Sequence, residues 1–310
     1  GKRAVQAHYD RTGIAAKVHQ GEYLGLYKTE HILKEHPLIS LIIPNKDHIE
    51  DLDKCISSID QKSTYDNYEY IIVENNSEKE ETFRYYKDLE KENPRVHVVC
   101  WEGEFNYSAI NNYGAKFAKG EYLLLLNNDT EIINGSCLEE MIGYCMHDNV
   151  GAVGARLYYS DETIQHAGVI VGFGGIAGHA FIGLPRSANG YFSRIICAQD
   201  MSAVTAACMM VKKSVFEEVG GLSTELQVAF NDIDLCMKIR EAGYLIVYNP
   251  YAELYHYESK SRGLENTKEK VDRFNGEIAT FAQKWPEILK NGDPYYNPNL
   301  SLERCDFSLK

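Results

Sequence analysis

Four consecutive leucines at positions 123–126 run directly into Asn127, Asn128 and Asp129. An apolar run of this length fits one fully buried strand and is too short to span a membrane. The residues after such a strand lie at its carboxyl end, where open α/β sheets bind their ligands. A carboxylate beside amides suits a divalent cation such as Mg²⁺ or Mn²⁺ that carries a diphosphate. The same triplet could instead end the strand and begin an ordinary turn.

Strand and helix patterns alternate from residue 38 onward. The apolar periodicity predicts strands at 38–44, 68–73, 95–99 and 122–126, separated by helices at 49–59, 78–90 and 108–118. This order predicts a parallel, doubly wound sheet with right-handed crossovers. Further along we expect helices at 136–147, 213–219 and 230–242, the last closed by Gly243, and strands at 150–155, 204–212 and 244–248.

Three segments divide the chain. Residues 1–37 lack a clear period and indicate a linker or a small helical appendage, and 38–263 form the main α/β domain. Residues 264–310 form a C-terminal extension, helical and amphipathic over 266–290, that could close over a site, dock a partner or mediate self-association. The glycine-rich stretch 164–183 predicts a loop or irregular hairpin.

Composition limits the kind of protein this is. The chain has 310 residues, is 44% hydrophobic and carries a formal charge of −13, which favours a large core and disfavours nucleic acid or a polybasic membrane anchor. It has no apolar stretch of about 18 residues and no visible signal peptide, so we expect a soluble, cytoplasmic protein. The eight cysteines form no Cys-x-x-Cys pair, which favours reduced core cysteines over zinc ligands or disulfides. The first residue is Gly, which fits an excised piece of a longer polypeptide or an artificial start.

Polar residues cluster at four predicted strand ends and at the start of one helix. The strand-end clusters are 44–47, 74–77, 127–129 and 256–259, and the fifth cluster, 231–234, opens the helix. One such cluster is an ordinary turn, but five of them predict a binding site at this edge of the sheet.

Six segments in this order resemble the family 2 inverting glycosyltransferases, which have the GT-A fold with a mostly parallel, Rossmann-like central sheet flanked by helices. They are LISLIIPNKDHIEDLDKCISSI, YEYIIVENNS, FNYSAINNYGAKFAKGEYLLLLNNDTEI, VTAACMMVKKSVFEEVGGLSTEL, FNDIDLCMKIREAGY and LYHYESKSRG, and they cover roughly residues 38 to 263. Within the family the chain is most similar to bacterial enzymes that extend polysaccharides or surface glycans, including those with several transferase domains in one polypeptide.

The resemblance implies a nucleotide-sugar site. Glu74 matches an acid that accepts hydrogen bonds from uracil, and Pro44 and Asn45 match a loop that lies along the nucleoside. Asn127, Asn128 and Asp129 match the Asp-x-Asp motif with its first acid replaced. Asp129 is therefore the expected metal ligand, with Asn127 and Asn128 on the ribose or phosphate.

His256 matches a histidine that often adds a metal ligand, and Ser259 and Arg262 could contact the diphosphate, the arginine through a bidentate fork. We also assign Asp47, Asn76, Asn106 and Asn111 to the donor-binding set. With one carboxylate in the triplet, we expect metal to bind poorly without nucleotide.

Asp232 matches the family's catalytic base, which takes the proton from the acceptor hydroxyl. Asn231 stands where a Glu is usual, so Asp234 is the alternative base. The two carboxylates lie about 200° apart on a helix, and only one can face the site. Without the resemblance, Asp232 would be taken for a carboxylate that caps the helix.

These features imply transfer of a hexose or deoxyhexose from a nucleotide sugar to a saccharide acceptor, with Mn²⁺ or Mg²⁺. We expect the donor to be a UDP-sugar rather than a dTDP-sugar. The partners would be the donor, the acceptor glycan, other transferase domains of the polypeptide and a second copy, near the inner face of the membrane.

Two other functions stay open. A nucleotidylyltransferase would need a glycine-rich loop after the first strand, which 44–48 lacks. A non-catalytic carbohydrate- or nucleotide-binding module would fit Asn127 and Asn231. The sequence also leaves open whether His166 and His179 touch a substrate, and whether Trp101 and Tyr107 stack on a sugar or only pack.

Overall fold

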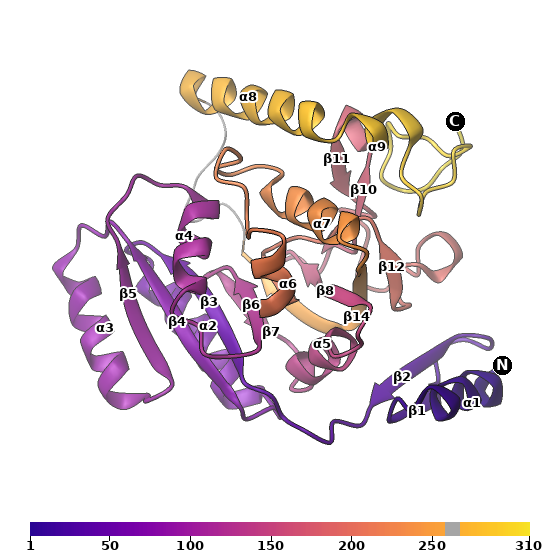
Figure 1. The fold of residues 1–310 in the computed structure, drawn as a ribbon, viewed down its shortest axis with the longest axis horizontal. Helices are drawn as coiled ribbons and strands as arrows, with labels where there is room; N and C mark the ends of the chain where they lie inside the picture. The colour runs from indigo at the N-terminus through magenta and orange to yellow at the C-terminus, as the bar shows by residue number, and fades with distance from the viewer. Residues whose placement is uncertain (258–266) are drawn as a thin grey trace.

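The computed structural model describes residues 1–257 and 267–310. Its main feature is a ten-stranded mixed sheet (Figure 1). The strands of this sheet are β3 (Ile39–Asn45), β4 (Tyr68–Asn75), β5 (Val96–Trp101), β6 (Tyr122–Leu126), β7 (Thr130–Ile132), β8 (Val150–Tyr158), β9 (Ile164–His166), β12 (Gln199–Met201), β13 (Cys208–Lys212) and β14 (Leu245–His256). Their order is β12-β14-β8-β13-β6-β3-β4-β5, with β7 paired to β14 and β9 paired to β8.

The first half of the sheet is parallel, as the alternation of strands and helices along the sequence predicted. β3 pairs in parallel with β4 and β6, and β4 with β5. Every residue of β4 is buried, which is the pattern expected when helices cover both faces of a parallel sheet. The predicted strand 122–126 coincides with β6.

The second half of the sheet contains antiparallel strands that the sequence did not reveal. β13 runs antiparallel to both β6 and β8, whereas β14 runs parallel to β8. Consequently β3, β4, β5, β6, β8 and β14 all point the same way, and the prediction of a mostly parallel sheet is confirmed. The predicted strand 204–212 begins only at Cys208.

Helices pack on both faces of the sheet. On one face lie α2 (Ile49–Lys62), α3 (Glu80–Glu92) and α5 (Cys137–Cys145), and on the other lie α4 (Tyr107–Ala115), α6 (Lys213–Glu218) and α7 (Asn231–Glu241). Alternate residues of one strand pack into the hydrophobic cores on the two faces of the sheet, because successive side chains point to opposite faces. Leu124 faces the first set of helices and Leu125 the second.

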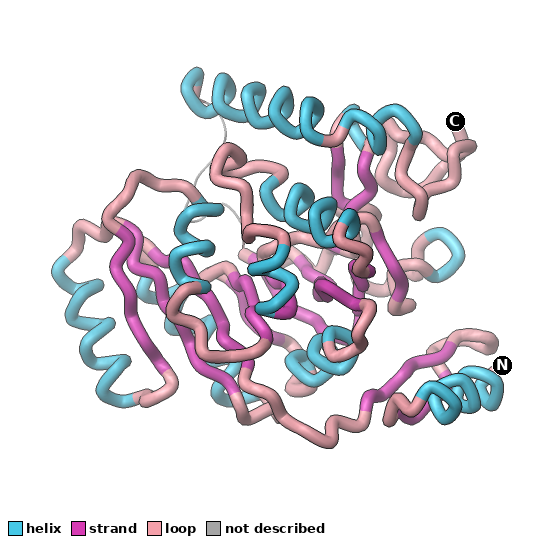
Figure 2. The backbone as a smooth tube through the Cα atoms, viewed as in Figure 1, coloured by secondary structure: helices cyan, strands magenta, loops and turns pink. Residues whose placement is uncertain are grey.

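The N-terminal segment is a helix followed by a hairpin, set to one side of the sheet (Figure 2). It comprises α1 (Lys2–Thr12), β1 (Ala16–Gln20) and β2 (Tyr27–His31), with β1 and β2 antiparallel. A helical appendage was expected, but the hairpin was not. β2 reaches α5 through an ion pair of 2.5 Å between Lys28 and Glu140.

The C-terminal segment comprises α8 (Lys268–Lys284), α9 (Pro286–Asn291) and an irregular tail. The tail packs on a small hairpin of β10 (Val169–Val171) and β11 (Ala177–His179), which lies in the predicted glycine-rich stretch. The rings of Phe307 and Phe181 stack 4.4 Å apart there.

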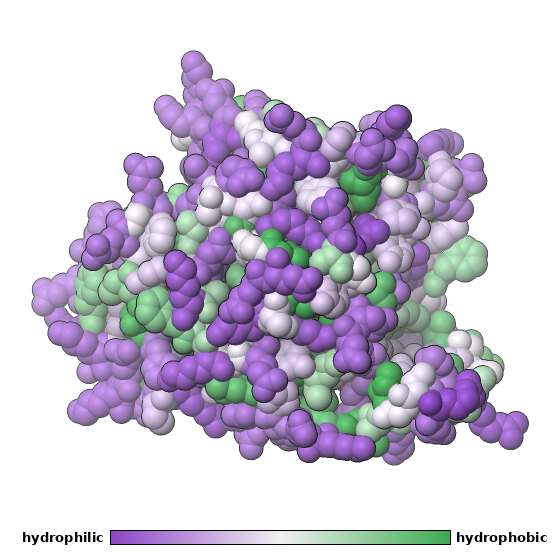
Figure 3. All heavy atoms as spheres, viewed as in Figure 1, coloured by the Kyte–Doolittle hydropathy of each residue, from purple (hydrophilic) through white to green (hydrophobic). Residues whose placement is uncertain are grey.

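The surface carries few large apolar patches on the face shown in Figure 3, where hydrophilic side chains predominate, including those over α8. Among the described residues, no helix is both long and apolar enough to cross a membrane. All eight cysteines lie in the described part of the chain, and none of them forms a disulfide.

Candidate active site

A cavity of about 630 Å³ lies at the carboxyl ends of β3, β4 and β6. It brings four of the predicted polar clusters together with the helix α7. Its walls are formed by Pro44, Asn45, Lys46, His48, Asn75, Asn76, Phe105, Tyr107, Asn127, Asn128, Asp129, Thr205, Ala206, Ala207, Val228, Asn231, Asp232 and His256. The sheet edge therefore carries the cavity that the strand-end clusters predicted.

Asp129 and His256 lie side by side on the cavity wall, with Asp129 Oδ1 3.2 Å from His256 Nε2. The backbone produces this pairing. β7 leaves the end of β6 and pairs with β14, so that Thr130 lies opposite His256, and the N–H of Tyr257 donates to the carbonyl of Asp129 at 2.9 Å. Both side chains are buried, at 5% and 7% exposure.

Gln165 sets the orientation of the His256 ring. Its Nε2 donates to the main-chain oxygen of His256 at 3.2 Å, and its Oε1 lies 2.7 Å from His256 Nδ1. A carbonyl oxygen can only accept, so the hydrogen-bond network assigns the proton to Nδ1. The lone pair of Nε2 then faces Asp129 and accepts from Asn127 Nδ2 at 3.0 Å.

This pair of atoms fits a divalent cation. The nitrogen lone pair and the carboxylate oxygen, 3.2 Å apart, are both electron donors and could bind one cation together. Adjacent ligands of an octahedral Mg²⁺ at about 2.1 Å are separated by roughly 3 Å. The described residues offer no group of three or more His, Cys, Asp or Glu side chains that could hold a metal, so the protein would supply few of the ligands.

A chain of hydrogen bonds links the ends of three neighbouring strands below the cavity. Asn128 Nδ2 donates to Asn45 Oδ1 at 2.6 Å, Asn45 Nδ2 donates to the hydroxyl of Tyr86 at 2.8 Å, and that hydroxyl donates to Glu74 at 2.7 Å. The chain fixes the two asparagine amides on the wall before any ligand arrives.

Glu74 is placed differently from the prediction. It is 3% exposed and lies below the cavity wall rather than on it. One oxygen accepts the Ser77 N–H at 2.5 Å, and the other accepts the hydroxyls of Ser77 and Tyr86. Its carboxylate is occupied by these donors, so in this structure Glu74 supports the wall and Asn75, the next residue, lines it.

Asp47 also turns away from the cavity. Its carboxylate accepts hydrogen bonds from the N–H groups of Glu78 and Lys79 and from the hydroxyl of Thr82, at the start of α3. Desolvation would raise the pKa of Asp47, but these hydrogen bonds outweigh it and the pKa lies below its usual value. Asp47 is therefore a helix-capping residue.

Asn106 and Asn111 were assigned to the donor, yet neither lines the cavity. Asn106 caps α4, accepting the N–H of Ala109 at 2.9 Å, and donates to the carbonyl of Thr224. Asn111 is buried in α4 and donates to the carbonyl of Tyr107 at 2.9 Å. Asn76 remains on the wall, whereas Ser259 and Arg262 lie outside the described residues.

Asp232 and Asp234 point in different directions from α7, as the helical spacing predicted. Asp232 lines the cavity and its Oδ2 accepts the N–H of Ala206 at 3.1 Å. Asp234 is fully buried and accepts hydrogen bonds from Ser223 and Trp285, so it is not available to a substrate. Asn231 lines the cavity beside Asp232.

Of the two aromatic residues and two histidines whose roles the sequence left open, Tyr107 lines the cavity and the other three do not. Tyr107 is part of the wall and its hydroxyl lies 3.3 Å from Asn127 Oδ1, whereas Trp101 packs edge-on against Tyr113. His166 is fully buried, 3.0 Å from His179 between their Nδ1 atoms. Burial, followed by the nearby His179 and His256, holds the pKa of His166 well below its usual value, so it stays neutral.

Several wall residues escaped the sequence analysis. They are Lys46, His48, Asn75, Phe105, Val228 and the backbone segment 205–207, to which Gln165 is added as the partner of His256. Phe105 and Val228 carry no chemical signal in the sequence, and Gln165 is far from His256 along the chain. Lys46, His48 and Asn75 could have been found, because they lie within or beside the predicted clusters.

The fold and the cavity define a nucleotide-diphospho-sugar transferase fold of the GT-A type. In agreement, the structure of GalNAc-T7 with UDP, GalNAc and Mn²⁺ superposes with a TM-score of 0.65 over 82% of this chain and 50% of that one, at 14% identity. The model of the family described as "Glycosyl transferase family 2" matches residues 40–220. The chain belongs to glycosyltransferase family 2.

Two relatives align with the whole chain. The uncharacterized protein y4gI of Sinorhizobium fredii is 44% identical, and the O-antigen biosynthesis protein RfbC of Myxococcus xanthus is 35% identical. Both are longer, since the chain spans 34% of y4gI and 24% of RfbC.

Proposed function

We propose that this chain is a catalytic unit of a metal-dependent, inverting glycosyltransferase in bacterial surface-glycan synthesis. It would transfer a hexose or deoxyhexose from a nucleotide sugar, with a UDP-sugar as the preferred donor, to a saccharide acceptor. One observation carries the proposal. Asp129, His256 and Asp232 line the same cavity at the sheet edge, together with the asparagines at the ends of β3 and β4. The name of the relative RfbC supports the choice of pathway. The greater length of the relatives supports further domains in the same polypeptide.

Asp129 and His256 would hold Mn²⁺ or Mg²⁺, which when bound neutralises charge on the diphosphate leaving group. Because the described residues bring only these two ligands close together, affinity for the free ion should be low and should rise when nucleotide supplies oxygens. Asn45, Asn75 and Asn76 would hydrogen-bond the base and ribose, a task for which an amide suits the imide edge of uracil.

Asp232 would act as the general base. Its carboxylate accepts the proton of the acceptor hydroxyl while that oxygen forms a bond to the anomeric carbon. The bond from this carbon to the diphosphate oxygen breaks, its electron pair leaves with the nucleoside diphosphate, and attack from the opposite side inverts the configuration. The N–H of Ala206 holds one oxygen of Asp232 in place at 3.1 Å.

The experiment is to incubate the protein with UDP-, dTDP- and GDP-sugars and Mn²⁺ and to measure release of nucleoside diphosphate. Asp232→Asn should lower the transfer rate about 10²–10⁴-fold, the usual effect of losing a general base, with the binding of UDP and Mn²⁺ retained. EDTA should abolish release.

Glu241→Gln is the matched control, since it changes an exposed carboxylate at the other end of the same helix and should leave the transfer rate unchanged. Activity that survives Asp232→Asn would reject the base. Asn127 and Asn231, which stand where acids are usual, favour a second candidate, a binding module without activity. Nucleotide binding without release from any sugar would support it.

A further inference from the structure

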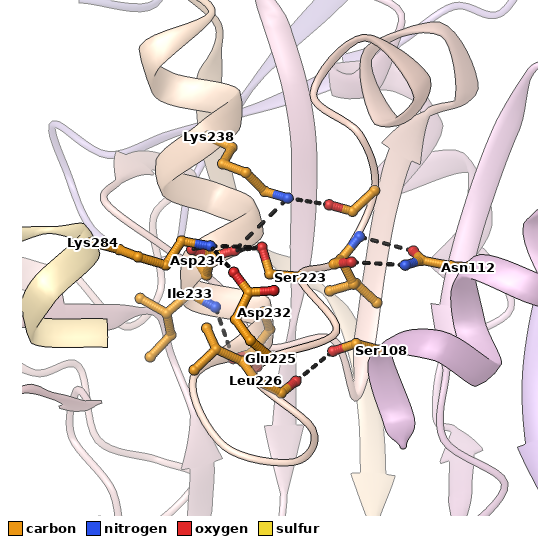
Figure 4. Close-up of polar contacts among 12 residues, drawn as sticks. Ser108, Asn112, Ser223, Glu225, Leu226, Asp232, Ile233, Asp234, Lys238 and Lys284 are labelled. Carbon is orange, nitrogen blue, oxygen red and sulfur yellow. Dashed lines mark hydrogen bonds and ion pairs between the residues drawn. The ribbon is translucent and has the colours of Figure 1, made fainter. Parts of the chain in front are cut away.

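The loop 222–230 lies between α6 and α7 and leads directly into the first turn of α7, which carries Asp232. It is tied on one side to α4 (Figure 4). The hydroxyl of Ser108 donates to the carbonyl of Leu226 at 2.6 Å, and the side chain of Asn112 bonds both the N–H and the carbonyl of Leu222. Its other side faces the C-terminal helix α8.

Glu277 of α8 holds the end of this loop. Its side chain is 3% exposed, and its two oxygens accept the N–H groups of Val228 at 2.7 Å and Ala229 at 3.3 Å. Val228 itself lines the cavity. A buried carboxylate that receives two successive backbone N–H groups fixes both the position and the direction of that backbone.

Phe230 is the next residue, and its backbone is left-handed, with φ of 61°. A non-glycine residue adopts this conformation only where its surroundings impose it. The ring of Phe230 lies 5.6 Å from that of Phe274 and 5.7 Å from that of Phe281, both on α8. The helix therefore also holds the strained residue that turns the chain into α7.

Contacts from the C-terminal end of α8 fix the orientation of α7 about its own axis. Lys284 Nζ lies 2.9 Å from Asp234 and 2.8 Å from the hydroxyl of Ser223, and the indole N–H of Trp285 donates to Asp234 at 2.9 Å. Asp234 is fully buried. Because Asp232 lies on the opposite side of the same helical turn, fixing Asp234 against α8 directs Asp232 into the cavity.

We infer that α8 positions the general base, with Glu277 and Lys284 as its positioning residues. This inference rests on the proposed function, since it assigns the two side chains to the reaction through Asp232. Neither of them lines the cavity, so they act on the rate and not on the donor. A displacement of about 1 Å in a catalytic group can cost about 10²-fold in rate, which makes such a support consequential.

The first test is Glu277→Gln in the full chain. The amide keeps the size of the side chain but turns an N–H₂ group toward one of the two backbone N–H groups. With the nucleotide sugar that gives release, kcat should fall about tenfold, while the KM for that sugar and the affinity for UDP with Mn²⁺ stay within twofold. Amide hydrogen exchange over 222–236 should accelerate.

Glu287→Gln is the matched control, because Glu287 is an exposed carboxylate on α9 and bonds only Asn291 among the described residues. It should leave kcat and hydrogen exchange unchanged. Lys284→Arg keeps the charge and should retain most of the rate, whereas Lys284→Met should lower kcat and Lys290→Met, on exposed α9, should not.

The outcomes are distinct. Unchanged hydrogen exchange or unchanged kcat in Glu277→Gln, with Asp232→Asn inactive, overturns the inference and leaves the proposed function intact. An equal loss in kcat and in donor affinity would mean general damage to the site and would also overturn it. If Asp232→Asn is fully active, or the unaltered protein releases no nucleotide from any sugar, the proposed function fails and the inference fails with it.

Discussion

Four of the described carboxylates near the candidate site show how neighbouring groups decide what each carboxylate can do. Asp129 and Asp232 open onto the cavity, whereas Glu74 and Asp234 are buried among hydrogen-bond donors. A buried carboxylate with several donors already attached stabilises the structure and has little capacity left for a ligand. The same residue type therefore serves two purposes only a few residues apart in the sequence.

We expect Gln165→Leu to weaken the metal site. Removing the oxygen that holds the Nδ1 proton frees the His256 ring to turn, and loss of such a supporting partner usually lowers metal affinity about 10–100-fold. Titration of Mn²⁺ with UDP present, followed by electron paramagnetic resonance, measures this. Gln165→Glu keeps an accepting oxygen and serves as the control. Equal Mn²⁺ affinity in Gln165→Leu would show that the ring needs no such support.

At the residue scale the sequence predicted the sheet edge where the cavity lies, but not the direction of the side chains there. Successive residues of a strand point to opposite faces, so Glu74 and Asn75 could not both reach the cavity. The family resemblance favoured the acid, whereas in the structure the amide of Asn75 lines the cavity. Asp232 and Asp234 were separable in advance because their helical spacing allowed only one to face the site.

The docking of the N-terminal hairpin on α5 depends on close contact at one glycine. A Cβ at Gly143 would lie 2.7 Å from the Cβ of His31, closer than such atoms approach. The hairpin can therefore approach α5 only because position 143 has no side chain.

Gly143→Ala should destabilise this contact, because the added methyl meets a part of His31 that cannot swing away. Overpacking of this kind costs about 1–3 kcal/mol. Gly276→Ala in α8 is the control, since nothing described lies within 4 Å of its Cβ. That change should instead stabilise by about 0.5–1 kcal/mol through helix propensity. Thermal unfolding of both variants gives the comparison, and equal melting points would contradict it.

The same contact should make the hairpin sensitive to pH. His31 Nε2 and His147 Nε2 are 2.9 Å apart, and burial together with the charge of His147 lowers the pKa of His31 to about 4. Between pH 4 and its unfolded value of 6.5, the unfolded chain binds more protons, so the free energy of unfolding rises with pH. This stabilisation is complete above pH 6.5 and is lost as the pH falls toward 4.

Amide exchange of residues 14–32, corrected for its intrinsic pH dependence, should show more opening at pH 5 than at pH 7.5. His31→Phe, which cannot titrate, should reduce that difference. An equal pH effect in the variant would assign the opening to another group, such as His147, whose pKa burial also lowers.

At the element scale, long apolar strands were predictable and short or polar ones were not. β1 and β2 have the sequences AKVHQ and YKTEH, in which only Ala16, Val18 and Thr29 are buried, too few to show an alternation. β7 has three residues. The direction of β13 depends on its pairing with β6 and β8, which no local pattern encodes.

Over the whole molecule, the C-terminal tail is part of the main fold. Asp293 accepts the N–H of Val171 and the hydroxyl of Ser202, and the ring of Phe307 packs on those of Phe181 and Tyr191. We propose that residues 38–257 and 267–310 form one packing unit, in place of two separate domains. The amphipathic pattern predicted the helix but could not identify the surface on which it packs.

Phe307→Ala should cost about 3–5 kcal/mol of stability, as expected when a buried aromatic ring is removed. Phe307 is 3% exposed, whereas Leu309 is 77% exposed and provides the control, with an expected effect within about 0.5 kcal/mol. Urea denaturation measures both. A loss below about 1 kcal/mol for Phe307→Ala would mean that the tail is dispensable to the core.

The antiparallel course of β13 has a consequence for how this site can diverge. It brings residues 205–207 to the edge where β6 ends, so part of the wall is made of main chain. The N–H of Ala206 holds Asp232, its carbonyl accepts the hydroxyl of Tyr107, and the carbonyl of Ala207 accepts the N–H of Asn127. Main-chain groups are present whichever side chain occupies a position, so these hydrogen bonds can be kept when residues 205–207 are substituted. Proline at 206 is the exception, because it has no N–H to offer.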